Sequence, residues 1–73
     1  MNTNEFEYME KYLPKEHWDN MMFMGTTEDG IYRYKHILTR RYVNIDSEGS
    51  FYIYNGHGYD VVSKEDGIRN LLS

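Results

Sequence analysis

The sequence of 73 residues contains no cysteine, a single proline and no long apolar segment. Because cysteine is absent, the chain can form neither a disulfide nor a thiolate metal site, which fits a reducing compartment. No apolar run approaches the roughly 18 residues that a membrane span needs. The N-terminal stretch MNTNEFEYMEKYLP is too polar for a signal peptide. These absences predict a soluble protein of the cytoplasm that does not associate with membranes.

Sequence motifs for catalysis and for metal binding are also missing. His17, His36 and His57 stand apart and have no cysteine partners, so they form no zinc-binding pattern. Asp46 and Glu48 lack the third acid and the distal glutamate of a calcium loop. No G-x-S-x-G motif and no phosphate-cradling glycine loop occurs, and a domain this small can scarcely enclose a dry catalytic site. We therefore expect no enzymatic activity, no bound metal and no cofactor.

The chain is rich in aromatic residues, with eight Tyr, three Phe and one Trp. A chain of this length buries only about 60% of its unfolded surface and is usually marginal in stability. Each buried aromatic ring removes about 150–250 Å² from water, so a few rings can dominate a small core. Self-association would enlarge the core further, which makes a homodimer a second route to stability.

Helices are predicted at both ends of the chain. Asn4 can cap the first helix, and Glu7, three residues later, can complete a capping box. Pro14 then forces Leu13 out of helical geometry and favours a second helical turn in PKEHWDN. Ser63 is the expected N-cap of a last helix. The buried stripes of the first and last helices are expected to contain Phe6, Met9, Leu13, Ile68, Leu71 and Leu72.

The first half of the middle region predicts a β-hairpin. Strands are expected over about residues 21–27 and 31–38, with a turn at Glu28-Asp29-Gly30, because an Asp-Gly step between apolar runs is a strong hairpin signal. The helical spacing of Trp18 and Met21 leaves a helix as the alternative for the first run.

The second half predicts two more strands, in RYVNI and FYIYN, joined by a loop in which Gly49 supplies the left-handed backbone. Residues 31–45 would span about 50 Å as one straight strand, which is too long for this domain, so a turn is expected at Leu38–Arg41. A short edge strand follows at Tyr59–Val62. The predicted fold is a single α+β domain over residues 1–73. It has an N-terminal helix bent at Pro14, an antiparallel meander of three to four strands and a short C-terminal helix.

Alternation of side chains along the strands predicts two different sheet faces. The face toward the core is expected to present Tyr32, Tyr34, Leu38, Val43, Ile45, Phe51 and Ile53. The outer face is expected to present Arg33, Lys35, Tyr42, Asn44, Tyr52 and Tyr54, because unpaired cations are costly to bury.

The charge is distributed unevenly along the chain. Residues 31–45 have four Lys or Arg and no Asp or Glu, although the whole chain has a net charge of −4. A basic, aromatic sheet face is what binders of single-stranded nucleic acid use, and here it would consist of Arg33, Lys35, Arg40, Arg41, Tyr42, Tyr52 and Tyr54. The chain lacks the dominating positive field of such proteins, and the same residues also suit an ordinary structural or interface face.

The acidic residues form a second candidate surface. Glu28 and Asp29 lie at the first predicted hairpin turn, and Asp46 and Glu48 lie at the second. A tight turn near residues 39–40 would bring these two hairpin turns to the same end of the sheet. Carboxylates on such a surface would lie about 6–7 Å apart, comparable to successive phosphates. This acidic surface would consist of Glu5, Glu7, Glu10, Glu16, Asp19, Glu28, Asp29, Asp46 and Glu48. An ordinary solubilising surface is the alternative.

In size and composition the whole chain resembles the small early proteins of large lytic phages, as seen in MNTNEFEYMEKYLP, NMMFMGTTEDG and NIDSEGSFYIYNGHG. The resemblance is one of type, without a diagnostic motif. Some of those proteins disable host proteins by occupying a nucleic-acid-binding site. The resemblance implies an inhibitor that acts in the host cytoplasm or nucleoid and whose acidic, DNA-mimicking surface binds a basic protein, such as a histone-like nucleoid protein.

Two alternatives stay open beside this hypothesis. The first is a module that binds nucleic acid directly through the basic, tyrosine-rich sheet face. The second is a structural subunit that self-associates through MMFM and the tyrosine face.

Overall fold

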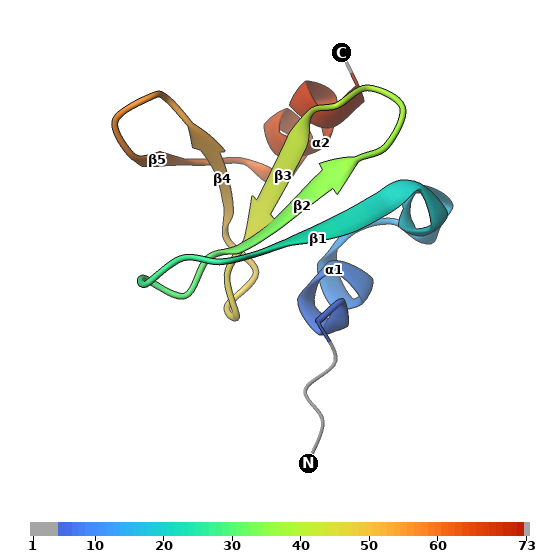
Figure 1. Cartoon of the computed structure of the whole chain (residues 1–73), viewed down its shortest axis with the longest axis horizontal. Helices are drawn as coiled ribbons and strands as arrows, with labels where there is room; N and C mark the ends of the chain where they lie inside the picture. Colours follow the sequence, from blue (N-terminus) through green and yellow to red (C-terminus); the bar gives the residue numbers. More distant parts are fainter. Residues whose placement is uncertain (1–4, 73) are drawn as a thin grey trace.

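The computed structural model describes residues 5–72, which form an α+β fold (Figure 1). The elements, in chain order, are α1 (Glu7–Tyr12), the 3-10 helix η1 (Lys15–Asn20), β1 (Met21–Thr26), β2 (Tyr32–His36), β3 (Tyr42–Ile45), β4 (Phe51–Tyr54), β5 (Tyr59–Val62) and α2 (Lys64–Leu72). The strands form one antiparallel sheet in the order β1-β2-β3-β4-β5. The predicted fold class is confirmed, with five strands instead of three to four. Within the described residues, no helix has the length and apolar character to cross a membrane.

The N-terminal helix starts later than the sequence predicts. Its N-cap is Phe6, whose side chain makes no capping bond, so Glu7 is the first helical residue and closes no capping box. Asn4, the expected cap, lies outside the described residues. The bend is confirmed, because Leu13 is extended at ψ 138° before Pro14. Trp18 fixes this bend by donating its indole N–H to the carbonyl oxygen of Leu13 at 2.8 Å.

Residues 21–26 form a strand and not a helix. In the β1–β2 hairpin, Met21 pairs with His36 and Phe23 with Tyr34, and the register then shifts before Thr26. Gly25 lies in this irregular stretch at φ +105°, a backbone conformation that glycine adopts at little cost. Met21 and Phe23 pack on the core, which leaves Met22 as the exposed side chain among these three.

The buried residue His36 organises the turn between β2 and β3. Its Nδ1 accepts the backbone N–H groups of Leu38 and Thr39, both at 3.2 Å. Arg40 closes the turn at φ +66° and donates its N–H to the carbonyl oxygen of His36 at 2.9 Å. The turn confirms the expected reversal. The inward placement of Leu38 is wrong, because the strand ends at His36 and Leu38 is 73% exposed on the turn.

The sheet opens between β3 and β4. These strands share only the pairs Asn44–Tyr52 and Ile45–Phe51 next to their turn, whereas β2 pairs with β3 over four residues. Beyond the two shared pairs the strands diverge, and α2 packs against both of them. The open side of this divergence forms the concave surface described below.

The helices and one face of the sheet enclose the core. The face predicted to point inward is buried at Tyr34, Val43, Ile45 and Phe51. The core cluster consists of Met9, Leu13, Met21, Tyr34, Val43, Ile45, Phe51 and Leu71. Burial raises the pKa of Tyr34 to about 12, and its hydroxyl donates to the carbonyl oxygen of Glu5 at 2.9 Å.

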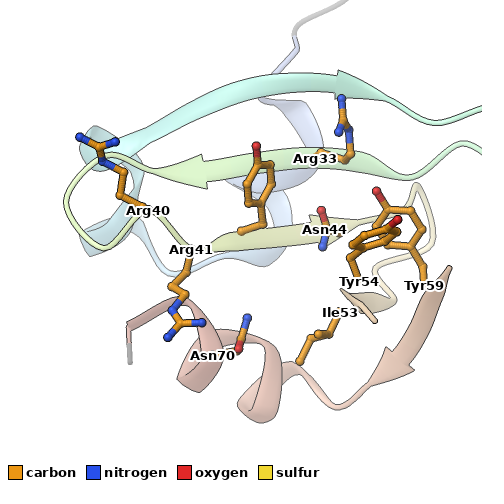
Figure 2. A pocket seen from close by; sticks show the side chains of 9 residues that line it. Arg33, Arg40, Arg41, Asn44, Ile53, Tyr54, Tyr59 and Asn70 are labelled. Carbon is orange, nitrogen blue, oxygen red and sulfur yellow. The ribbon is translucent and has the colours of Figure 1, made fainter. Parts of the chain in front are cut away.

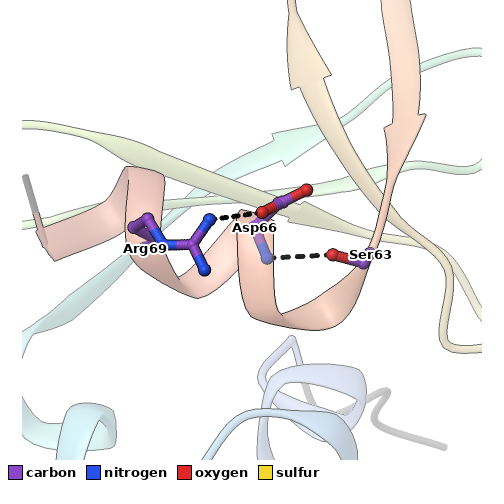
Figure 3. Close-up of polar contacts among 3 residues, drawn as sticks. All are labelled: Ser63, Asp66 and Arg69. Atoms are coloured by element: carbon purple, nitrogen blue, oxygen red, sulfur yellow. Dashed lines mark hydrogen bonds and ion pairs between the residues drawn. The ribbon is translucent and has the colours of Figure 1, made fainter.

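The C-terminal helix α2 begins as predicted. The hydroxyl of Ser63 accepts the backbone N–H of Asp66 at 3.1 Å, and Asp66 pairs with Arg69 one turn later (Figure 3). Leu71 is fully buried, but the expectation for Leu72 is wrong because its side chain is 48% exposed at the end of the helix.

Gly67 lets α2 approach the sheet closely. A Cβ atom at this position would lie 2.7 Å from Cδ2 of Phe51 and 3.2 Å from its Cβ. Phe51 is itself only 2% exposed, so its ring has little room to move.

We predict that Gly67→Ala lowers the free energy of unfolding by about 1–3 kcal/mol, the usual cost of overpacking a core. This loss exceeds the gain of about 0.5–1 kcal/mol expected from replacing a helical glycine by alanine. Urea denaturation followed by the fluorescence of Trp18 measures the change. Gly58→Ala is the matched control, since nothing lies within 4 Å of its added Cβ. Equal stabilities of the two variants would contradict the close packing of α2 on Phe51.

Candidate functional site

The outer face of the sheet carries the side chains that the sequence assigns to it. Arg33 pairs with Asn44, and Asn44 with Tyr52, so their side chains point to the same face. Lys35 and Tyr42 form the next pair on this face, and the ammonium group of Lys35 lies 6.0 Å from the centre of the Tyr42 ring.

A hollow of about 650 Å³ opens on this side of the molecule, where β3 and β4 diverge. We call it the Arg–Tyr hollow (Figure 2). It is lined by Arg33, Arg40, Arg41, Tyr42, Asn44, Ile53, Tyr54, Tyr59 and Asn70. Among residues 5–72, no Asp or Glu contributes to this lining. The hollow therefore combines guanidinium groups, phenol rings and amides without a neutralising carboxylate in its wall.

Arg33 is held in place by the irregular part of β1. Its Nη2 donates to the carbonyl oxygen of Met24, and a Cβ at Gly25 would lie 3.2 Å from that Nη2 atom. Its Nε is buried and has no hydrogen-bond partner among the described residues. The backbone of β1 thus fixes this charge at the rim of the hollow.

Arg40 and Arg41 come from the β2–β3 turn and are exposed. Neither arginine forms an ion pair with a carboxylate of residues 5–72, whereas Arg69 pairs with Asp66 on α2. Figure 2 shows the two side chains pointing away from each other, so that Arg41 extends toward α2 and Arg40 to the opposite side of the turn. Each guanidinium group is therefore available to a separate anion.

Asn44 lies on the predicted face but is only 2% exposed, so the expectation that it points into solvent is wrong. Its Nδ2 donates to the carbonyl oxygen of Tyr52 at 3.1 Å. Its Oδ1 is buried and has no hydrogen-bond partner within residues 5–72. An unpaired buried acceptor costs free energy unless a ligand or a water molecule supplies a donor.

Two tyrosine rings form the aromatic end of the hollow. Tyr54 and Tyr59 are paired across β4 and β5, with ring centres 5.1 Å apart and planes inclined at 52°. Tyr54 is 57% exposed, so part of its ring surface is open to a stacking partner. The sequence prediction included Tyr54 but missed Tyr59, which the β4–β5 pairing reveals.

Ile53 and Asn70 also line the hollow without having been predicted as site residues. Ile53 was expected to lie inside, but it is only half-buried because β4 has left β3 by this point. Asn70 reaches the hollow from α2. No short-range sequence pattern marks either residue, because both positions depend on the divergence of the strands.

The acidic surface lies outside the wall of the hollow. Eight of its nine members are exposed, and Asp46 is half-buried. The turns that carry Glu28 and Glu48 lie at the same end of the sheet, opposite the β2–β3 turn, as predicted (Figure 1). Helix α1 contacts this end, because the hydroxyl of Tyr12 donates to the carbonyl oxygen of Ser47 at 3.4 Å. Glu16 and Asp19 do not lie at this end, because they belong to η1, whose Asn20 carbonyl oxygen accepts the backbone N–H of Ile37 beside the β2–β3 turn at 2.7 Å. The structure thus divides the nine acidic residues between the two ends of the sheet, and none of them lines the hollow.

Asp46 uses its carboxylate to hold the β3–β4 turn together. Its Oδ1 accepts the backbone N–H groups of Glu48 and Ser50, both at 2.9 Å, and its Oδ2 accepts the hydroxyl of Tyr52 at 2.7 Å. Burial alone would raise the pKa of Asp46, but these hydrogen bonds outweigh it and the pKa is lowered. The hydrogen bond from the hydroxyl of Tyr52 to Asp46 also raises the pKa of Tyr52. The carboxylate of Asp46 therefore stabilises the turn. Tyr52, which was predicted as part of the nucleic-acid-binding face, does not line the hollow.

No group of three or more His, Asp or Glu side chains within residues 5–72 is arranged to hold a metal ion.

The lowered pKa of Asp46 predicts a pH-dependent contribution to stability. The folded state favours the carboxylate, so the stabilisation is present above the ordinary pKa of aspartate and is lost as pH falls through the lowered pKa. We expect Tyr52→Phe to lower the free energy of unfolding by about 1 kcal/mol near pH 7 and by less near pH 3. Urea denaturation across this range measures the difference.

Tyr54→Phe is the matched control for this prediction, because the hydroxyl of Tyr54 donates to the neutral carbonyl oxygen of Gly56 at 3.2 Å. Its effect should not depend on pH in this range. A loss for Tyr52→Phe that stayed constant from neutral to acidic pH would contradict the role assigned to Asp46.

Comparison of the chain with protein-family models found no matching family. Searches of curated proteins and of solved structures likewise found no match. The Arg–Tyr hollow and the acidic surface are therefore the features on which a function can be argued.

Proposed function

We propose that this protein is a non-catalytic binding module that holds single-stranded nucleic acid in the Arg–Tyr hollow. The observation that supports this proposal is the composition of the hollow. Three arginines and three tyrosines meet there, and no Asp or Glu of residues 5–72 lines it. Single-strand binders combine cations that follow the phosphates with rings on which bases stack.

The contacts have separate physical roles. The guanidinium groups of Arg40 and Arg41 can each donate two parallel hydrogen bonds to a phosphate. The open face of Tyr54 can stack on a base, which contributes about 1–3 kcal/mol per base. Nothing in this set distinguishes one base sequence from another, so we expect weak sequence preference.

The net charge of −4 limits the strength of this binding. Long-range attraction of a polyanion is weak for an acidic protein, so the affinity depends on short-range contacts within the hollow. With two or three phosphates contacted, the logarithm of the binding constant should fall with the logarithm of salt concentration with a slope of about −1 to −2. This slope is shallow compared with that of a strongly basic binder.

We predict that the double variant Arg40→Gln, Arg41→Gln binds single-stranded DNA or RNA at least about tenfold more weakly than the unchanged protein, because two charge-assisted phosphate contacts are lost. Fluorescence anisotropy with labelled oligonucleotides at low salt measures the affinity. The matched control is Lys64→Gln, Arg69→Gln, which changes the net charge equally but lies outside the hollow.

Two results would overturn the proposal. One is the absence of binding by the unchanged protein at low salt. The other is an equal loss in both double variants, which would show that net charge alone controls binding. Circular dichroism of each variant checks that the fold is intact.

A second candidate function is inhibition of a basic host protein through the acidic surface. The observation that favours it is that the β1–β2 turn, with Glu28, and the β3–β4 turn, with Glu48, lie at the same end of the sheet and outside the hollow (Figure 1). A DNA-binding groove of a host nucleoid protein has the complementary charge, and such complementarity mainly accelerates association. The phage-like composition of the chain is consistent with this role.

For this candidate we predict that Glu28→Gln, Asp29→Asn slows association with a purified histone-like nucleoid protein several-fold at low salt, because complementary charge steers encounter. Surface plasmon resonance measures the association rate. Asp60→Asn, Glu65→Gln is the control, since it removes the same charge from residues outside the acidic surface. Equal rates for the two variants, or no complex with the unchanged protein, would exclude this use of the acidic surface.

A further inference from the structure

The two ends of the Arg–Tyr hollow differ in chemistry. Figure 2 shows Arg40 and Arg41 at one end, next to the β2–β3 turn, and Tyr54 and Tyr59 at the other end, on the β4–β5 hairpin. Asn44 lies between the two ends. A nucleotide has the same polarity, with a charged phosphate at one end and a flat base at the other.

We infer that the hollow is a site for one nucleotide, with its phosphate at Arg41 and its base against Tyr54 and Tyr59. This inference rests on the proposed function and makes it more specific. The proposed function requires only that single-stranded nucleic acid binds on this face of the sheet. The inference adds that a single nucleotide carries most of the recognition.

Two buried polar atoms without a hydrogen-bond partner among the described residues lie on neighbouring strands beside the hollow. Asn44 is 2% exposed, and its Oδ1 has no partner within residues 5–72. Arg33 is its cross-strand neighbour, and the Nε of Arg33 is likewise buried without a described partner. Both residues line the hollow. Buried polar groups are nearly always paired in folded proteins. Because Nε of Arg33 is a donor and Oδ1 of Asn44 is an acceptor on directly paired residues, a small shift of either side chain can join them. They therefore form a polar wall of the hollow, and the inference depends on the two ends of the site.

The size and shape of the hollow agree with a compact ligand. Its volume of about 650 Å³ lies in the range of small-molecule sites. Asn70 of α2 contributes to the wall below β3, so the hollow is bounded by a helix as well as by strands (Figure 2). A flat binding surface for a long stretch of single-stranded nucleic acid would instead carry cations along its whole length.

Four probes test the inference on the full chain: adenosine 5′-monophosphate, adenosine, inorganic phosphate and an adenylate octanucleotide. Isothermal titration calorimetry gives the affinities, and ¹H–¹⁵N NMR spectra locate the sites. We expect the monophosphate to bind at least about tenfold more tightly than adenosine or phosphate alone, because both ends of the hollow are then occupied. We expect the octanucleotide to exceed the monophosphate by less than about tenfold. The shifted amides should be those of the hollow.

Two variants separate the ends of the site. Arg41→Gln should lower the affinity for the monophosphate while leaving that for adenosine unchanged, so the ratio of the two affinities falls toward one. Tyr54→Leu should lower both affinities and preserve the ratio. Arg69→Gln, which removes the same charge on α2 outside the hollow, should change neither affinity more than about twofold.

The possible failures are distinguishable. If the octanucleotide binds and the monophosphate does not, the inference of a single-nucleotide site is wrong, and the proposed binding of single-stranded nucleic acid is retained. If no probe binds, both are wrong. Binding of the monophosphate with NMR shifts confined to residues outside the hollow would also overturn the inference.

Discussion

The short pairing between β3 and β4 is the constraint on which the rest of the structure depends. The two strands share only the pairs Asn44–Tyr52 and Ile45–Phe51 before they diverge. Phe51 can then receive α2 on the core side, because Gly67 leaves room for its ring. The same divergence opens the outer side of the sheet into a hollow bounded by strands and by α2. One local feature of pairing therefore produces both the packing of the last helix and the concave surface that a ligand requires.

Much of the fold could be predicted from local sequence patterns because their physical causes are local. The break at Pro14, the cap at Ser63 and the left-handed glycine at Gly49 each follow from the chemistry of one or two residues, and all three are present. Two of the errors have a common cause in tertiary structure. Leu38 and Leu72 fit the apolar periodicity but lie just where an element ends, so the chain turns them into solvent.

The candidate site was predictable in part for the same reason. Strand alternation correctly places Arg33, Tyr42 and Tyr54 on the outer face, because the face of a side chain depends only on its position along the strand. Alternation does not indicate where a face becomes concave. The contributions of Ile53 and Asn70 arise from the separation of β3 and β4 and from the packing of α2. No pattern within either segment encodes that separation.

The local arrangement of charge bears on the proposed binding of an anion by this acidic protein. The molecule measures 34 × 27 × 18 Å, whereas charges are screened over about 8–10 Å at physiological salt. Carboxylates beyond that distance contribute little to the potential inside the hollow. Asp60, however, is paired with Ile53 of the hollow wall, and η1, which carries Glu16 and Asp19, lies beside the β2–β3 turn. At lower salt the acidic residues repel an anionic ligand over a longer range, which offsets part of the attraction by the arginines. Under the proposed function, an anion would therefore be held by short-range contacts with the arginines, because these neighbouring carboxylates leave no strong long-range positive field around the hollow.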